Sequence, residues 1–117
     1  MSRGRRSAGV AGAILAALLV GAAAASMAAA EPTAEITIRE HRFDPVETRI
    51  PAGERVTLYV VNADSSVEEF ESTDLNIEKI IPGGVRARIK IGPLQPGTYK
   101  VFGEFHPDTA QGLIVAE

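Results

Sequence analysis

The sequence predicts an all-β sandwich, because polarity alternates at the period of a strand after residue 30 and turn residues separate the alternating segments. In the stretch E-I-T-I-R, Ile36 and Ile38 share one face. In R-V-T-L-Y-V-V, the side chains that share a face are Val56, Leu58 and Val60. No helical periodicity follows the first thirty residues, so each alternating segment is expected to form one strand of a sheet with a buried face.

Turn signals divide the chain into about seven strands. Pairs such as Asp44-Pro45 and Pro96-Gly97 are typical of turns and end the alternating segments at short, regular intervals. The segment 73–84 is longer and mixed in character, and we expect a short helical turn over residues 76–79. The expected strands cover residues 35–39, 46–50, 55–62, 68–72, 85–91, 98–103 and 111–116.

The first thirty residues have the pattern of a secretory signal peptide. Three arginines precede an apolar run over residues 8–25, and small residues lead to Ala30. We expect cleavage after Ala30, with Ala28 as the alternative, which leaves residues 31–117 as one exported or periplasmic domain. The apolar run is also long enough to span a membrane, so retention as an anchor remains open.

The charge of the exported domain excludes one class of partner. All fifteen acidic residues and nine of the twelve basic residues follow residue 30, which gives a formal charge of 9 − 15 = −6. Nucleic acid requires basic patches, so we expect no nucleic-acid binding, whereas an acidic surface favours cations. The chain has no cysteine, so no disulfide supports the domain.

Two longer stretches carry a resemblance to a known superfamily. F-D-P-V-E-T-R-I-P-A-G-E-R-V-T-L-Y-V-V-N and G-P-L-Q-P-G-T-Y-K-V-F resemble the two halves of the cupredoxin frame, which implies a Greek-key β-sandwich. E-E-F-E-S-T-D-L-N-I-E-K and G-E-F-H-P-D-T-A-Q-G look most like the cysteine-free cupredoxin-like domains associated with bacterial high-affinity iron permeases. That resemblance implies a role in iron uptake and a permease-linked membrane protein as partner.

The blue-copper ligands of the superfamily are mostly missing. Carried over by this resemblance, the hairpin histidine falls on His106, the cysteine on Gly103, and the axial methionine on or beside Gln111. The first histidine has no counterpart, and the acidic pair Glu68-Glu69 occupies its region. Type 1 copper requires a thiolate, so we expect no blue-copper electron carrier.

What remains is a candidate site made of carboxylates and one imidazole. Glu104 and His106 are two residues apart and would face the same way on a strand, with Phe105 pointing into the core. Glu69 and Glu71 form a second such pair, and both pairs are expected to meet at the mouth of the sandwich. The expected metal ligands are His106, Glu104, Glu69 and Glu71, with Glu68 and Glu78 as outer options.

The residue types leave the identity of the metal open between iron and copper(II). Carboxylate and imidazole suit both ions, Fe(III) favours the carboxylates, and the stability order of divalent ions favours copper. Each glutamate also has an ordinary interpretation as a solvated surface carboxylate, and His106 as a packed loop residue. His41 lies in an early turn, far from the hairpin in chain order, and is not among the expected ligands.

The sequence therefore predicts an exported metal-binding protein that serves metal uptake or handling. We expect no enzyme, because the two histidines of the chain lie in no nucleophile–base motif. A half-filled ligand set would invite a homodimer. Two alternatives stay open: a metal-free sandwich that acts as a protein-interaction module, and a copper oxidase or ferroxidase, which would require a redox-active metal with an open position.

Overall fold

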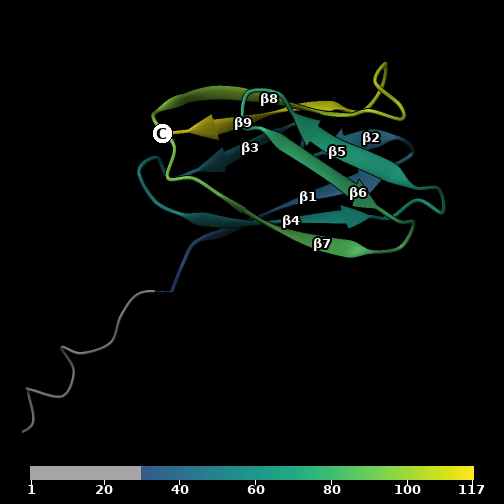
Figure 1. Ribbon diagram of the computed structural model, residues 1–117, viewed down its shortest axis with the longest axis horizontal. Helices are drawn as coiled ribbons and strands as arrows, with labels where there is room; N and C mark the ends of the chain where they lie inside the picture. The colour runs from purple at the N-terminus through teal and green to yellow at the C-terminus, as the bar shows by residue number, and fades with distance from the viewer. Residues whose placement is uncertain (1–29) are drawn as a thin grey trace, which may run out of the picture. The chain divides into compact units, whose positions relative to one another are not determined.

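Two β-sheets face each other in residues 30–117, which are the residues that this computed structural model describes (Figure 1). One sheet has the order β2-β1-β4-β7, and the other has the order β3-β9-β8-β5-β6. The predicted all-β sandwich is therefore confirmed. The strands of this part of the chain are β1 (Thr33–Arg39), β2 (Arg42–Asp44), β3 (Glu47–Ile50), β4 (Val56–Asn62), β5 (Glu68–Ser72), β6 (Ile77–Ile81), β7 (Arg86–Ile91), β8 (Gly97–Gly103) and β9 (Gln111–Ala116).

The structure has two strands more than the seven expected, and the helical turn predicted over residues 76–79 is wrong. Residues 77–81 form β6, which pairs antiparallel with β5 from Ser72↔Ile77 to Glu68↔Ile81. Asn76 has a left-handed φ of 57°, which asparagine tolerates better than most residues, and this conformation closes the hairpin. The other additional strand, β2, pairs with the end of β1.

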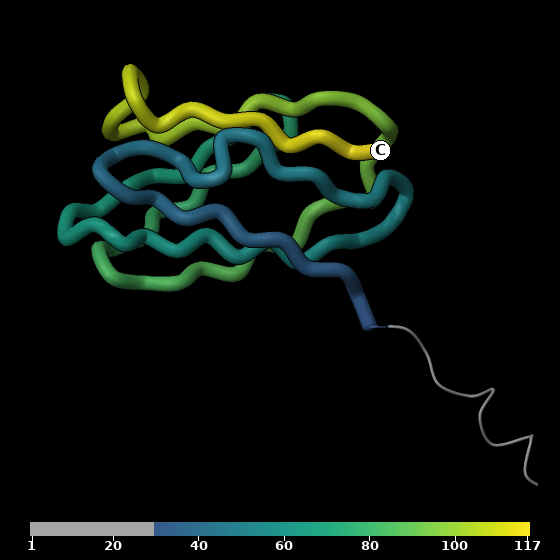
Figure 2. The backbone as a smooth tube through the Cα atoms, turned by 180° about the vertical axis from the view of Figure 1, so that it is seen from behind, coloured from purple at the N-terminus to yellow at the C-terminus, as the bar shows by residue number. Residues whose placement is uncertain are grey.

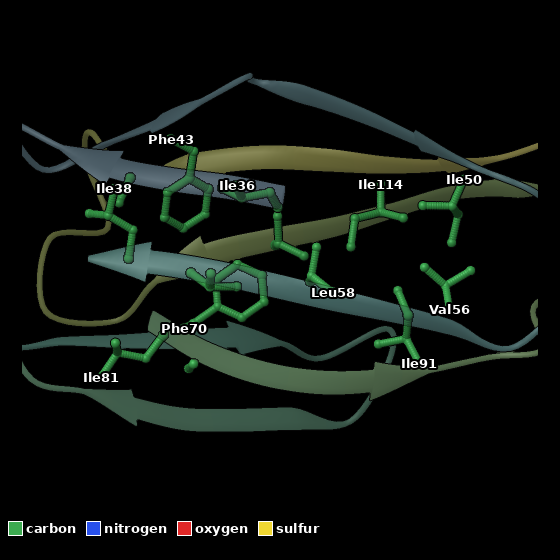
Figure 3. Close-up of a cluster of buried hydrophobic side chains, with 14 of the residues drawn as sticks. Ile36, Ile38, Phe43, Ile50, Val56, Leu58, Phe70, Ile81, Ile91 and Ile114 are labelled. Carbon is green, nitrogen blue, oxygen red and sulfur yellow. The ribbon is translucent and has the colours of Figure 1, made fainter. Parts of the chain in front are cut away.

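The core lies between the two sheets and follows the predicted alternation. Ile36, Ile38 and the apolar face of β4 are almost completely buried, as expected from their period of two. Figure 3 shows Phe43 from β2 and Phe70 from β5 directed toward one another across the core, with ring centroids 5.5 Å apart. Val85 lies in the strand expected over residues 85–91, but in the structure it precedes β7 and is exposed.

Three loops gather at one end of the sandwich. β1 runs parallel to β4, and β3 runs parallel to β9, while the remaining neighbours are antiparallel. The β1–β2, β4–β5 and β8–β9 loops consequently lie together at the end opposite the C-terminus, which is the right-hand end in Figure 1 and the left-hand end in Figure 2. We call this end the mouth of the sandwich.

The predicted signal peptide lies outside the described residues. Within residues 30–117, no helix has the length and apolar character needed to cross a membrane.

Candidate metal centre

Glu68 is a glutamate buried at the mouth of the sandwich. It begins β5, its side chain points inward like that of Phe70, and only 2% of it is exposed. Its Oε1 atom accepts hydrogen bonds from the backbone N–H groups of Glu69 (3.0 Å) and Phe105 (2.9 Å). Its Oε2 atom lies 2.7 Å from Nδ1 of His106. Buried carboxylates require such partners, and Glu68 has three.

The carboxylate of Glu68 occupies the space next to the position that the resemblance assigns to the missing cysteine. A Cβ atom added to Gly103 would lie 2.6 Å from Cδ of Glu68, 2.7 Å from its Oε2 and 2.8 Å from Cβ of Ala110. No side chain fits there without displacing one of these atoms. Glu68, which the sequence predicts only as an outer option, lies at the centre of the site in the structure.

His106 lies in a turn rather than on a strand, which corrects the predicted geometry of the hairpin. β8 ends at Gly103, and residues 104–109 form turns in which the N–H of His106 donates to the carbonyl oxygen of Gly103 (3.2 Å). Because the alternation of a strand stops there, Phe105 is 45% exposed instead of filling the core as expected. The His106 side chain is 28% exposed, so part of it is accessible to solvent.

A second histidine, His41, which is not among the ligands expected from the sequence, stacks on the first. The rings of His41 and His106 are nearly parallel (8°), with their centroids 3.6 Å apart. His41 comes from the β1–β2 loop, and its Nε2 atom lies 3.3 Å from Oγ of Ser66 in the β4–β5 loop. The only sequence signal for this pair is that the whole chain contains just these two histidines.

Asp64 fixes the β1–β2 loop in position. Its carboxylate accepts hydrogen bonds from the N–H groups of Glu40 (2.7 Å) and His41 (2.9 Å), both of which have left-handed φ values. Burial raises the pKa of the Asp64 carboxyl, but these two backbone donors outweigh it, and the pKa lies below its ordinary value. The fully buried Asn62 supports Asp64 in turn, because its Oδ1 accepts the N–H of Asp64 and its Nδ2 donates to two carbonyl oxygens.

The other expected ligands form an acidic cluster on the outer face of the second sheet. Glu69 and Glu71 alternate with the buried Glu68 and Phe70, so they point away from the core. Together with Glu78 of β6, which pairs with Glu71, they offer carboxylate oxygens that all lie within 4.8 Å of one another.

Desolvation and the crowding of charge in the acidic cluster raise the pKa of its central residue, Glu71. Desolvation raises the pKa of Glu71, and the charges of Glu104 and Glu69 raise it further. Glu78 adds both a hydrogen bond and a charge, and the pKa of Glu71 reaches about 7.

The structure therefore divides the expected ligand set between two places. The acidic cluster contains Glu69, Glu71 and Glu78, and Glu104 adjoins it, since its N–H donates to the carbonyl oxygen of Glu69 (2.9 Å). His106 instead pairs with Glu68 and stacks on His41 at the mouth. The cause is the pleat of β5, which sends Glu68 to one face of the sheet and its neighbour Glu69 to the other.

The raised pKa of Glu71 predicts a pH dependence of stability. The folded state holds this proton up to about pH 7, whereas the unfolded chain releases it near the ordinary value of 4.5, so folding stability should fall as pH rises between these values. Glu71→Gln should therefore be more stable than the wild type in urea unfolding at pH 8. The advantage should disappear below pH 4.5, and an equal difference at both pH values would show that the raised pKa of Glu71 is not its cause.

The comparisons with known proteins agree with this architecture. A family model described as a cupredoxin-like domain matches residues 11–116. An uncharacterised protein of Rickettsia prowazekii is 46% identical over 81 residues, which span 69% of this chain and 65% of that protein.

Solved structures show the same fold at low sequence identity. Auracyanin A, a "blue" copper protein from Chloroflexus aurantiacus, superposes with a TM-score of 0.66 and 19% identity over 75% of this chain and 100% of its own. The metal-binding domain of CopA, a Cu(I)-exporting P-type ATPase of Streptococcus pneumoniae, superposes with a TM-score of 0.65 and 14% identity over 73% of this chain and 84% of its own. Unlike a blue-copper protein, this chain has no cysteine and therefore has no blue-copper site.

Proposed function

Because this chain belongs to the cupredoxin-like domain family, we propose that it is an exported protein that binds iron or copper and serves metal uptake or handling. Its role is binding and transfer rather than catalysis. Its relatives in fold include a blue copper protein and a Cu(I)-bound domain, and these support metal binding by this chain.

The observation that carries the proposal is the pairing of His106 with Glu68. Histidines that bind metals nearly always use one ring nitrogen for the metal and the other for a carboxylate or carbonyl, which fixes the ring. In this chain Nδ1 of His106 is held at 2.7 Å by a carboxylate that is itself fixed by two backbone donors. No hydrogen bond of Nε2 is found among residues 30–117, so a metal that binds this atom would displace no hydrogen-bond partner in the described part of the chain.

The two groups of side chains favour different ions. The imidazole of His106 suits copper(II), whereas the acidic cluster of Glu69, Glu71 and Glu78, next to Glu104, suits the harder Fe(III). The crowded negative charge also raises the local concentration of cations near the mouth. The link to iron uptake, and to a permease-linked membrane protein as the recipient, rests on the resemblance of E-E-F-E-S and G-E-F-H-P-D-T-A-Q-G to permease-associated domains.

Metal titration of the purified chain tests the proposal. Copper(II) should bind at one site in calorimetry, and His106→Ala should weaken it by more than the roughly 10- to 100-fold that loss of an outer hydrogen-bond partner costs. Binding of Fe(III), supplied as the citrate, should depend instead on the acidic cluster, so Glu71→Gln should bind it more weakly than the wild type. Absence of saturable binding of either ion by the wild type would contradict the proposed function.

A groove on the outer face of the second sheet favours a second candidate function, the recognition of a protein partner. Val46, Phe102 and Leu113 line this open groove of about 580 Å³, and Val46 is 63% exposed. Exposed apolar surface of this kind often marks an interaction site. If partner recognition is the whole function, excess copper(II) should leave the melting temperature of the wild type unchanged, whereas a bound metal would raise it by mass action.

A further inference from the structure

The two histidines of the chain are brought together from loops that are far apart in sequence. His41 belongs to the β1–β2 loop and His106 to the β8–β9 loop, yet their rings stack with 3.6 Å between centroids. Imidazole is the ligand type that copper(II) and zinc(II) share a preference for in proteins. Two imidazoles at the mouth offer a metal two nitrogen ligands, whereas the proposed function relies on the single nitrogen of His106.

The backbone holds His41 at this position against its local preference. Glu40 and His41 both adopt left-handed conformations, with φ values of 54° and 56°, which a residue with a Cβ atom avoids unless its surroundings impose them. Here the Asp64 carboxylate imposes them by accepting both N–H groups. The place of His41 next to His106 is thus specified by the fold.

The two rings differ in how firmly they are held. His106 is fixed through Nδ1 by the buried Glu68 at 2.7 Å. The His41 ring has a longer, exposed contact of 3.3 Å with the hydroxyl of Ser66. His106 is therefore the rigid member of the pair and His41 the member that can turn.

Stacked rings cannot bind one ion as they stand. A metal lies close to the plane of each imidazole that binds it, at about 2 Å from the nitrogen. Two nearly parallel rings with centroids 3.6 Å apart share no such point. Joint binding therefore requires one ring to leave the stack, and the weaker contact of His41 makes it the one that moves.

We propose that His41 is a second imidazole ligand, which swings from its stack on His106 so that both histidines bind one divalent ion such as copper(II). This inference rests on the proposed function and extends it, because it names a ligand from the β1–β2 loop. The part that moves when the metal binds is the His41 side chain, while Asp64 keeps the backbone of the loop in place.

The test compares copper(II) binding by the full chain and by two matched variants. His41→Phe keeps an aromatic ring for the stack but removes its nitrogens, and His106→Phe does the same on the opposite side. The wild-type EPR spectrum should show coupling to two imidazole nitrogens, and His41→Phe should show one. His41→Phe should also lose at least the roughly tenfold in affinity that loss of even an outer hydrogen-bond partner costs.

Distinct results separate the two proposals. If His41→Phe binds copper(II) with wild-type affinity and an unchanged spectrum while His106→Phe does not bind, the role of His41 is wrong and the proposed function stands. If the wild type itself binds neither copper(II) nor zinc(II), the role of His41 is wrong, and the proposed function is wrong as well if Fe(III)-citrate also fails to bind.

A measurement on the wild type keeps the inference testable if a variant does not fold. With zinc(II) as a diamagnetic probe, the ring protons of both histidines should shift in NMR spectra at one equivalent. A shift confined to His106 would overturn the assignment of His41.

Discussion

Replacing Glu68 with alanine is expected to destabilise the domain by about 3 kcal/mol, because each buried donor left without an acceptor costs about 1–3 kcal/mol. The backbone N–H groups of Glu69 and Phe105 both lose their partner, and Nδ1 of His106 loses a third bond. In a domain of this size, about 3 kcal/mol corresponds to a drop of roughly 12 °C or more in the melting temperature. Urea unfolding and thermal melting at pH 7 measure the loss.

Two further variants separate the effect of losing the hydrogen bonds of Glu68 from the effect of losing a negative charge. Glu68→Gln keeps an oxygen that can accept from both backbone groups, so it should cost about 1 kcal/mol, the usual net value of one hydrogen bond. Glu54→Ala removes an exposed glutamate and should stay within about 0.5 kcal/mol of the wild type. If Glu68→Ala proves as stable as Glu54→Ala, the buried carboxylate does not organise the mouth of the sandwich.

Replacing Phe70 with alanine is expected to destabilise the domain by about 3–5 kcal/mol, the usual cost of deleting a buried aromatic ring. Phe70 is completely buried, packs against Phe43 and lies between the two sheets (Figure 3). Small domains have a total stability of only about 5–15 kcal/mol, so this loss should leave part of the population unfolded at 37 °C. Chemical unfolding monitored by circular dichroism measures the change.

Phe105 provides the matched control for Phe70. It has the same side chain but is 45% exposed in the turn after β8, so Phe105→Ala should lie within about 0.5 kcal/mol of the wild type. Equal losses for the two variants would mean that the ring of Phe70 does not hold the sheets together.

The strands could be predicted from the sequence because their signal is local. Alternation in segments such as β1 and β4 follows directly from the pleat, and each buried face was identified from a few consecutive residues. β2 is only three residues long, and β6 has exposed residues at Glu78, Lys79 and Ile80, so neither shows a regular pattern. Pairing with β5, rather than local preference, makes residues 77–81 a strand.

The candidate site could be predicted only in part, because its contacts are long-range. The sequence identified His106 and the neighbouring glutamates, but alternation along β5 could not show that Glu68, rather than Glu69, meets the hairpin. The stack of His41 on His106 depends on the order of strands in the first sheet and on a left-handed turn held by Asp64. Neither determinant leaves a local pattern in the chain.

The central claim is that Glu68 holds His106 so that Nε2 faces a metal at the mouth of the sandwich. Anomalous diffraction at the copper edge, from a crystal of the wild-type chain grown with copper(II), tests it most directly. We expect one anomalous peak about 2 Å from Nε2 of His106, the length of a metal–imidazole bond, with Nδ1 still bound to Glu68. A peak on the acidic cluster alone, or no peak near His106, would contradict it.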